Sequence, residues 1–262
     1  MSKKIIAVAN QKGGVGKTTT AVNLGVALTL IDEGKKVCLI DLDPQANMTS
    51  YLKFEDNENS VGINNMMMAA VMGNLGQLGS DCILHNDING IDYVPADINL
   101  ASADFYLSQA IARESVLKRV LAMECFEAYD YIIIDCLPSL GVLLMNALTA
   151  SDGIIIPVQT QKFALQGLQG LNNVIAQIKD TVNPGLEVVG VLSTMVDNTT
   201  MSKTTSDELC KRFGNKMFNT VIHRAIEAAY SSDSGKSMCL ELHSKLGDEY
   251  IQLGHEVISR TK

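Results

Sequence analysis

The sequence has no excess of positive charge. Its 262 residues include 21 Lys and Arg against 29 Asp and Glu, which gives a formal net charge of −8. A strongly basic surface spread over the whole molecule, as in many nucleic-acid-binding proteins, is therefore excluded. All of the acidic excess lies in residues 1–200, whereas residues 201–262 are almost balanced. The charge distribution therefore does not exclude a local basic patch near the C-terminal end.

Metal-type cysteine spacing and long hydrophobic runs are also missing. No two cysteines have the C-x-x-C spacing, and several lie in apolar runs, so we expect buried, reduced thiols. The apolar stretch 5–9 is too short for a signal peptide core, and no later stretch has the length of a membrane span. We therefore expect a cytoplasmic protein. The cysteines expected to be reduced are Cys38, Cys82, Cys125, Cys136, Cys210 and Cys239.

Linkers and internal repeats are absent as well, and hydrophobic residues make up 47% of the chain. This composition and length suit a single α/β domain over residues 1–262. Short apolar runs alternate with helical patterns, which is typical of a doubly wound, mostly parallel sheet with helices on both faces. In such sheets ligands bind at the carboxyl ends of the strands.

The apolar runs and helical patterns can be placed along the chain. We predict that Pro157 ends the strand before it, and that residues 54–60 form a loop. The predicted strands are 5–9, 37–40, 91–94, 131–134, 153–156 and 188–192, with a short one near Val221. The first predicted helix follows the first strand. The later ones cover 66–71, 98–128 with a break, 141–150, 163–182, 200–213 and 237–258.

A glycine-rich stretch at residues 10–20 lies between the first strand and the first helix. Strand, glycine loop and helix form a phosphate cradle, because backbone N–H groups and the helix N-terminus attract anions. Lys17 would reach the β- and γ-phosphates, and Thr18 would offer its hydroxyl to Mg²⁺. Gln11 occupies the first glycine position of the usual G-x-x-x-x-G-K-[ST] pattern. The residues expected to bind the cofactor are Gly13, Gly14, Val15, Gly16, Lys17, Thr18 and Thr19.

Three aspartates follow predicted strands. Asp135 comes directly after residues 131–134, which is where a Walker B carboxylate holds Mg²⁺ beside Thr18. Asp41 and Asp43 end the second strand; one could support the metal and the other could orient the attacking water. Ordinary helix-capping or turn aspartates are the alternative for all three.

Lys12 precedes Gly13 and is a second cation in a loop that already has Lys17. In isolation it could be a solvated surface lysine. Alternatively, Lys12 would take part in the chemistry by neutralising a γ-phosphate held by another subunit, as a lysine version of an arginine finger.

These motifs resemble a known family. Lys12-Gly13-Gly14-Val15-Gly16-Lys17-Thr18-Thr19 resembles the deviant Walker A motif of the ParA/MinD class of P-loop ATPases. Residues 41–45 (DLDPQ) resemble the next block of its chromosome- and plasmid-partitioning branch, ParA or Soj. Residues 135–141 resemble the Walker B and switch block, and 157–160 with 163–165 resemble a further segment.

The resemblance implies an ATP–Mg²⁺ sandwich homodimer with slow hydrolysis that a ParB-like protein stimulates. It also implies nonspecific DNA binding by the ATP-bound dimer, and hence association with the nucleoid. Lys12 is similar to the signature lysine that crosses the dimer interface. Asp43 is similar to the aspartate that positions the hydrolytic water, with Asp41 in support. Gly16 is similar to a glycine beside the interface.

Several positions depart from the family pattern. Leu137 replaces the first proline of the switch block, and residues 161–162 replace a Glu-Tyr pair. Residues 224–233 match a C-terminal loop in which a second arginine has become Glu227, and residues 197–200 lack an arginine. A carboxylate at a position that faces DNA would repel phosphate, so DNA binding is expected but left open by Glu227.

The remaining basic side chains are candidates for contacts with DNA. On one helix they would not all share a face, so a solvated surface is the alternative. The candidates are Lys203, Lys211, Arg212, Lys216, Arg224 and Lys236.

Three other functions share the glycine loop. A MinD-like ATPase acting on a membrane or protein partner should end in a basic amphipathic helix, but the last helix has Asp248, Glu249 and Glu256 on its polar side. A nitrogenase-reductase-like protein needs paired cysteines at its interface, and Cys136 has no evident partner. A ligase of the dethiobiotin type would have no use for Lys12 together with the DLDPQ block. Membrane binding is therefore not expected.

Overall fold

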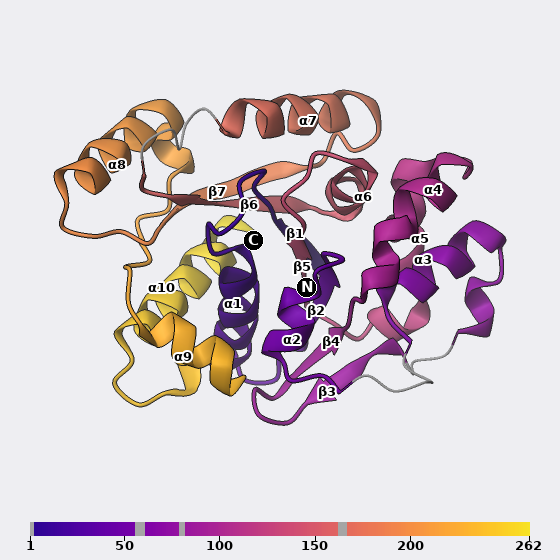
Figure 1. The fold of residues 1–262 in the computed structure, drawn as a ribbon, viewed down its shortest axis with the longest axis horizontal. Coiled ribbons are helices and arrows are strands. Elements are labelled where there is room, and N and C mark those ends of the chain that lie inside the picture. Colours follow the sequence, from indigo (N-terminus) through magenta and orange to yellow (C-terminus); the bar gives the residue numbers. More distant parts are fainter. Residues whose placement is uncertain (1–2, 56–60, 79–81, 162–166) are drawn as a thin grey trace.

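The computed structural model describes residues 3–55, 61–78, 82–161 and 167–262. One sheet has the strand order β3-β4-β2-β5-β1-β6-β7 and runs through the centre of the molecule (Figure 1). The β3–β4 pair is antiparallel, and the other pairs are parallel, as predicted. The strands are β1 (Lys4–Val8), β2 (Val37–Leu42), β3 (Leu84–Asn86), β4 (Ile91–Val94), β5 (Tyr131–Cys136), β6 (Gly153–Gln159) and β7 (Glu187–Thr194).

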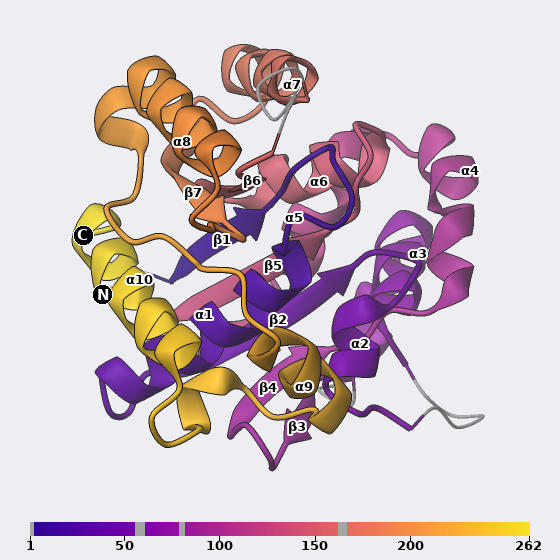
Figure 2. The same ribbon diagram turned by 60° about the vertical axis from the view of Figure 1, so that its left-hand side comes forward.

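Helices cover both faces of this sheet (Figures 1 and 2). Successive side chains of a strand point to opposite faces, so Ile6 and Val8 pack in one core with α1 and α10 while Ala7 and Ala9 pack in the other with α3 to α7. The helices are α1 (Lys17–Ile31), α2 (Asn47–Tyr51), α3 (Ile63–Met72), α4 (Ala103–Ser108), α5 (Val116–Val120), α6 (Val142–Ala150), α7 (Leu168–Thr181), α8 (Thr200–Phe213), α9 (Glu227–Ser234) and α10 (Lys245–Arg260).

Helix α1 is apolar on nearly all sides because it lies between the sheet and α10. The two helices approach closely at Gly254, where an added Cβ would lie 2.5 Å from Ile31 Cδ1. The apolar side of α10 is buried, including Leu246, Tyr250 and Leu253, so this last helix packs into the core as expected. No helix of the described residues is both long and apolar enough to cross a bilayer.

Two predicted helices are wrong in outline. The break predicted within residues 98–128 is present, at Ala112 (φ 51°), but the two helices around it, α4 and α5, are short, and three 3₁₀ segments make up the rest of the helical structure there. The stretch 237–258 is also divided. A 3₁₀ turn is followed by His243 at φ 64°, and α10 then begins after Ser244, whose hydroxyl accepts a hydrogen bond from Gly247 N at 3.0 Å.

Pro157 does not end its strand, contrary to the prediction, because β6 continues to Gln159. Ile155 O accepts from Ala9 N at 3.1 Å, so the residue two positions on faces the same neighbour, β1. Since β1 ends at Val8, the N–H that proline lacks is not needed there. The Pro157 carbonyl instead accepts from Asn10 Nδ2 at 2.7 Å.

Smaller differences remain. Only isolated bridges, Val191–Met217 and Val196–His223, replace the strand predicted near Val221. The edge strand β3 and the helix α9 were not predicted. Residues 163–166 of the helix predicted over 163–182, and residues 56–60 of the acidic loop, lie outside the described residues.

Candidate functional site

The carboxyl ends of β1, β2, β5 and β6 bring the predicted motifs to one edge of the sheet. Asp135 pairs in register with Val8 on one side and with Asp41 on the other. The glycine loop that follows β1 therefore lies beside both aspartate motifs, as expected for a sheet whose neighbouring strands are parallel.

One contact within the glycine loop and one to β7 hold its backbone. Asn10 Oδ1 accepts from Lys12 N at 2.9 Å, and Val15 O accepts from the Thr194 hydroxyl at 2.9 Å. Gly14 (φ 70°) and Gly16 (φ 84°) have the left-handed backbone that only glycine adopts without strain. The loop thus presents its backbone at the N-terminus of α1, where an anion is favoured.

Lys17 is a buried cation, with 7% of its surface exposed. Its Nζ donates to Lys12 O at 3.3 Å. Burial lowers the pKa of Lys17, and the nearby Asp135 carboxylate acts in the opposite direction. An ammonium group with one backbone carbonyl as partner retains donors for a phosphate.

Asp135 is 1% exposed, and neither of its carboxylate oxygens has a hydrogen-bond partner among the described residues. Burial and then the Asp41 carboxylate raise the pKa of Asp135 well above its usual range, while the nearby Thr18 hydroxyl and Lys17 oppose this shift. A buried carboxylate without a partner is costly, and a divalent cation would satisfy it.

The residues present fit Mg²⁺. The described part of the chain has no group of three or more His, Cys, Asp or Glu that could hold a metal ion. Mg²⁺ bound with a nucleotide does not need such a group, since it takes one or two protein oxygens and completes its shell with phosphates and water. Asp135 and the Thr18 hydroxyl are the protein oxygens available for it.

The structure gives Asp41 and Asp43 different positions. Asp41 is fully buried and accepts from Thr49 N (2.9 Å), the Thr49 hydroxyl (2.7 Å) and Asp43 N (3.1 Å). Burial raises the pKa of Asp41 to about 6, although the contacts with Thr49 oppose the shift. Asp43 lines the cleft next to the glycine loop, and its Oδ1 accepts from Gln45 N at 2.9 Å.

The cleft has a volume of about 750 Å³ and lies between the glycine loop, α2 and α9. The sequence motifs account for one wall, formed by residues of the glycine loop with Asp43. Gln45 and Pro138 belong to the motifs 41–45 and 135–141 found in the sequence. The remaining residues of the walls were not predicted: Asn47, Ser50, Tyr51, Lys53, Met195, Ala229, Ser232 and Asp233.

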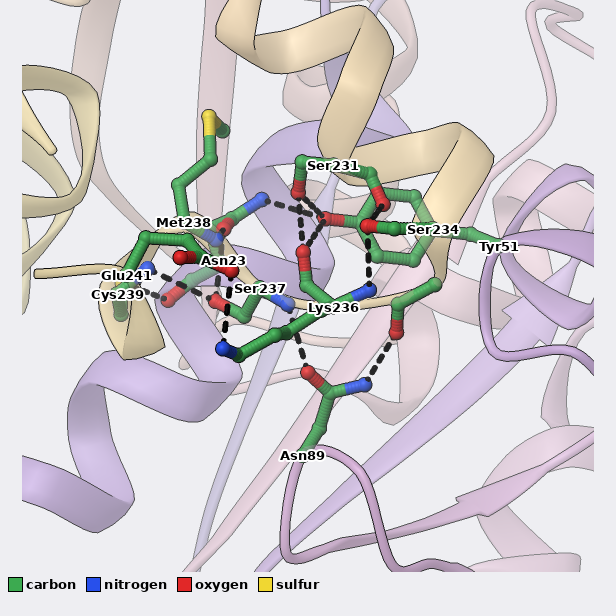
Figure 3. A network of polar contacts seen from close by, with 11 residues as sticks. Asn23, Tyr51, Asn89, Ser231, Ser234, Lys236, Ser237, Met238, Cys239 and Glu241 are labelled. Carbon is green, nitrogen blue, oxygen red and sulfur yellow. Dashed lines mark hydrogen bonds and ion pairs between the residues drawn. The ribbon is translucent and has the colours of Figure 1, made fainter.

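A polar network fixes α9 as a wall of the cleft (Figure 3). The Tyr51 hydroxyl contacts the Ser231 hydroxyl and lies 3.5 Å from Lys236 O. Farther along the network, Asn89 Nδ2 donates to Gly235 O at 2.8 Å, and Asn23 Oδ1 accepts from the Ser237 hydroxyl at 2.8 Å. These side chains are far apart in the sequence, so no spacing pattern could have connected them.

Comparison with known proteins gives the family. A family model described as an AAA domain (AAA_31) matches residues 3–188. The chain is 42% identical over 258 residues to the sporulation initiation inhibitor protein Soj of Bacillus subtilis, covering 97% of this chain and 98% of that protein. It is 36% identical over 264 residues to the chromosome partitioning protein ParA of Caulobacter vibrioides, covering 99% and 95%. The chain belongs to the Soj/ParA family.

Solved structures agree with this family and fold. A plasmid partition protein from Borrelia burgdorferi bound to AMPPNP matches with a TM-score of 0.79 and 27% identity over 100% of both chains. Cobyrinic acid a,c-diamide synthase from Mycobacterium smegmatis with bound ADP and magnesium matches with a TM-score of 0.74 and 33% identity, covering 89% of this chain and 92% of that chain. The predicted P-loop NTPase fold and the resemblance to ParA and Soj are therefore confirmed.

Lys12 of this Soj/ParA chain is exposed. The Lys12 side chain has no ion pair within the part of the chain that the structure describes. This differs from Lys17, which is buried in the same loop. One lysine is therefore held inside the site while the other is available at its surface.

The candidate DNA-binding residues do not form one cluster. Lys203, Lys211 and Arg212 are exposed on α8, and Arg224 is exposed before α9. The other two have acidic neighbours: Lys216 Nζ lies 3.8 Å from Glu187, and Lys236 Nζ lies 2.9 Å from Glu241.

Glu227 has a structural contact. It begins α9, where a negative charge suits the helix N-terminus, and its Oε2 accepts from the Ser244 hydroxyl at 3.0 Å. The Glu227 carboxylate therefore joins α9 to the start of α10.

Proposed function

We propose that the chain is a partition ATPase that forms a homodimer around two ATP–Mg²⁺ and moves a plasmid or chromosome, with hydrolysis that is slow until a ParB-like partner stimulates it. One observation carries the dimer mechanism: Lys12 is exposed in a loop whose other lysine is buried. A cation in that position can serve a phosphate held by another subunit.

The residues divide the chemistry among them. The loop N–H groups of residues 13–18 and the Lys17 ammonium hold the phosphates, and Thr18 and Asp135 would hold Mg²⁺, which supplies charge neutralisation on the phosphates when bound. Asp43, which lines the cleft, orients the attacking water. Asp41 acts behind it by accepting from Asp43 N.

The proposed role of Lys12 is to neutralise the γ-phosphate across the dimer interface. Loss of a transition-state cation lowers the rate by about 10³- to 10⁵-fold in related phosphoryl transfers. We therefore expect Lys12→Ala to bind ATP and to lose hydrolysis. Lys53→Ala removes another exposed cation that lines the same cleft and should retain most of the activity.

Mixing two inactive variants tests whether the lysine acts across the interface. Lys12→Ala and Asp43→Ala should each be inactive alone. In a mixed dimer, the Lys12→Ala subunit keeps its own Asp43 and receives Lys12 from its partner, so one site is complete. Recovery of ATPase activity on mixing is expected, whereas no recovery, or a fully active Lys12→Ala monomer, would contradict the mechanism.

We also propose weak, salt-sensitive DNA binding by the ATP-bound dimer through exposed cations of α8 and Arg224. Phosphate contacts make affinity fall with salt, so titration of the ATP-bound protein onto DNA at several salt concentrations measures them. Absence of binding even at low salt would remove both DNA binding and nucleoid association.

A MinD-like role on a membrane has less support. The apolar side of α10 is buried against α1, so this helix has no free apolar face to insert. Liposome flotation with ATP checks this, and we expect no binding.

A further inference from the structure

A smaller cavity of about 130 Å³ adjoins the cleft. Gly16, Thr19 and Met195 line both spaces, so a ligand whose phosphates lie on the glycine loop can extend from one into the other. The other walls of the cavity are mostly apolar and include Ile222 and Leu246. An apolar pocket with few polar groups beside a phosphate site has the character of a base-binding pocket.

Two hydroxyls of this cavity already have partners, whereas the exposed Arg224 side chain has no hydrogen bond or ion pair to a described residue. The Thr194 hydroxyl donates to Val15 O at 2.9 Å, and the Tyr250 hydroxyl lies 3.5 Å from the Thr20 hydroxyl. His223 differs, because one of its ring nitrogens is engaged and the other is not.

Two contacts fix His223. Its Nδ1 lies 2.6 Å from Glu249 Oε1, and its backbone N donates to Glu249 Oε2 at 2.9 Å. Glu249 is 8% exposed, whereas the His223 side chain keeps 39% of its surface exposed, so a buried carboxylate holds a ring that reaches the surface of the cavity. A carboxylate only accepts, so Nδ1 carries a proton, and whenever the ring is neutral Nε2 is an acceptor. Nε2 has no hydrogen bond to any described residue.

We propose that His223 determines base specificity by accepting a hydrogen bond at Nε2 from the exocyclic amino group of adenine. Adenine carries a donor at this position, whereas guanine carries a carbonyl oxygen, which would face Nε2 as a second acceptor. Glu249 is the positioning residue that sets the tautomer and the orientation of the ring. The inference rests on the nucleotide binding proposed above.

The test compares ATP with purine riboside triphosphate, which lacks only the amino group, and with GTP. Equilibrium binding with Mg²⁺ is measured for the wild type and for His223→Phe, which puts a phenyl ring without nitrogens in place of the imidazole. The wild type should bind ATP about tenfold more tightly than purine riboside triphosphate, the size of one hydrogen bond. His223→Phe should bind the two nucleotides equally, because neither of them can form this hydrogen bond with the variant.

His255→Phe is the matched control, since His255 is an exposed histidine of α10 that lines neither space. It should retain the preference of the wild type for ATP. Equal binding of ATP and purine riboside triphosphate by the wild type would overturn the inference, as would an unchanged preference in His223→Phe. Failure of all three nucleotides to bind would overturn the proposed function, and the inference with it.

Discussion

At the residue scale, the carboxylates that serve the chemistry of the site also lower the stability of the unliganded protein. Asp135 is buried with no hydrogen-bond partner among the described residues, beside a second buried carboxylate, Asp41. Such an arrangement weakens the unliganded protein, because a buried carboxyl group either loses the hydration of its charge or has to bind a proton, as the raised pKa of Asp135 indicates. The free energy is recovered when a cation binds, which couples folding to the ligand.

Replacing Asp135 by Asn should make this trade-off visible. We expect the unliganded variant to be more stable than the wild type by about 1–2 kcal/mol, since a neutral amide is cheaper to bury than a carboxylate. Thermal unfolding with and without Mg²⁺ and ATP measures it. The wild type should gain stability from Mg²⁺ in the presence of ATP and the variant should not; a less stable unliganded variant would contradict the argument.

Replacing Asp41 should lower the free energy of unfolding more than replacing Asp43. Asp41→Ala leaves Thr49 N, the Thr49 hydroxyl and Asp43 N without their acceptor, so the free energy of unfolding should fall by about 2–3 kcal/mol. Asp43→Ala loses one contact, from Gln45 N, and should stay within about 1 kcal/mol of the wild type. Urea denaturation checks both, and equal losses would contradict their different placement.

At the scale of elements, α9 is the least predictable part of the site. It is a short polar helix that lines the cleft, and the network of Figure 3 attaches it to α1, α2 and the turn between β3 and β4. Short helices have little intrinsic stability, so these tertiary contacts hold it in place.

Tyr51→Phe should loosen α9, because it removes the hydroxyl that contacts Ser231 and lies near Lys236 O. We expect a loss of about 1 kcal/mol and faster amide hydrogen exchange in residues 227–236. Tyr93→Phe is the control, since Tyr93 is also buried and its hydroxyl has no hydrogen bond to a described residue. Equal effects of the two substitutions would show that the network does not hold α9.

At the scale of the whole molecule, the acidic net charge limits how DNA can be bound. With a net charge of −8, attraction depends on where the cations lie, and the exposed candidates lie on α8 and before α9. Glu227, at the start of α9, lies three positions after Arg224 in the chain.

Glu227→Gln isolates the effect of this charge. The amide oxygen can still accept from the Ser244 hydroxyl, so the fold should be unaffected while a charge that repels phosphate is removed. We expect DNA affinity to rise a few-fold at low salt and the difference to shrink as salt increases. Glu33→Gln, an exposed residue beyond the far end of α1, makes the same change in net charge and should have little effect; an equal rise in both would assign the effect to net charge alone.

The sequence by itself determined the fold class and indicated the candidate phosphate site. The strands that carry the site, such as β5, are continuous apolar runs because both faces of the sheet are covered, so they can be recognised locally. The glycine loop is also a local feature, because its function depends on neighbouring backbone groups. Lys12, Lys17 and Asp135 could therefore be found by their positions relative to these runs.

Only the tertiary structure decided how the rest of the site is arranged. It placed Asp41 beneath the cleft and Asp43 on its wall, and it left Pro157 inside a strand because the neighbouring strand had ended. It also attached His223 to Glu249. Each of these outcomes depends on a contact between segments that are distant in the chain, and no local pattern of residues encodes such a contact.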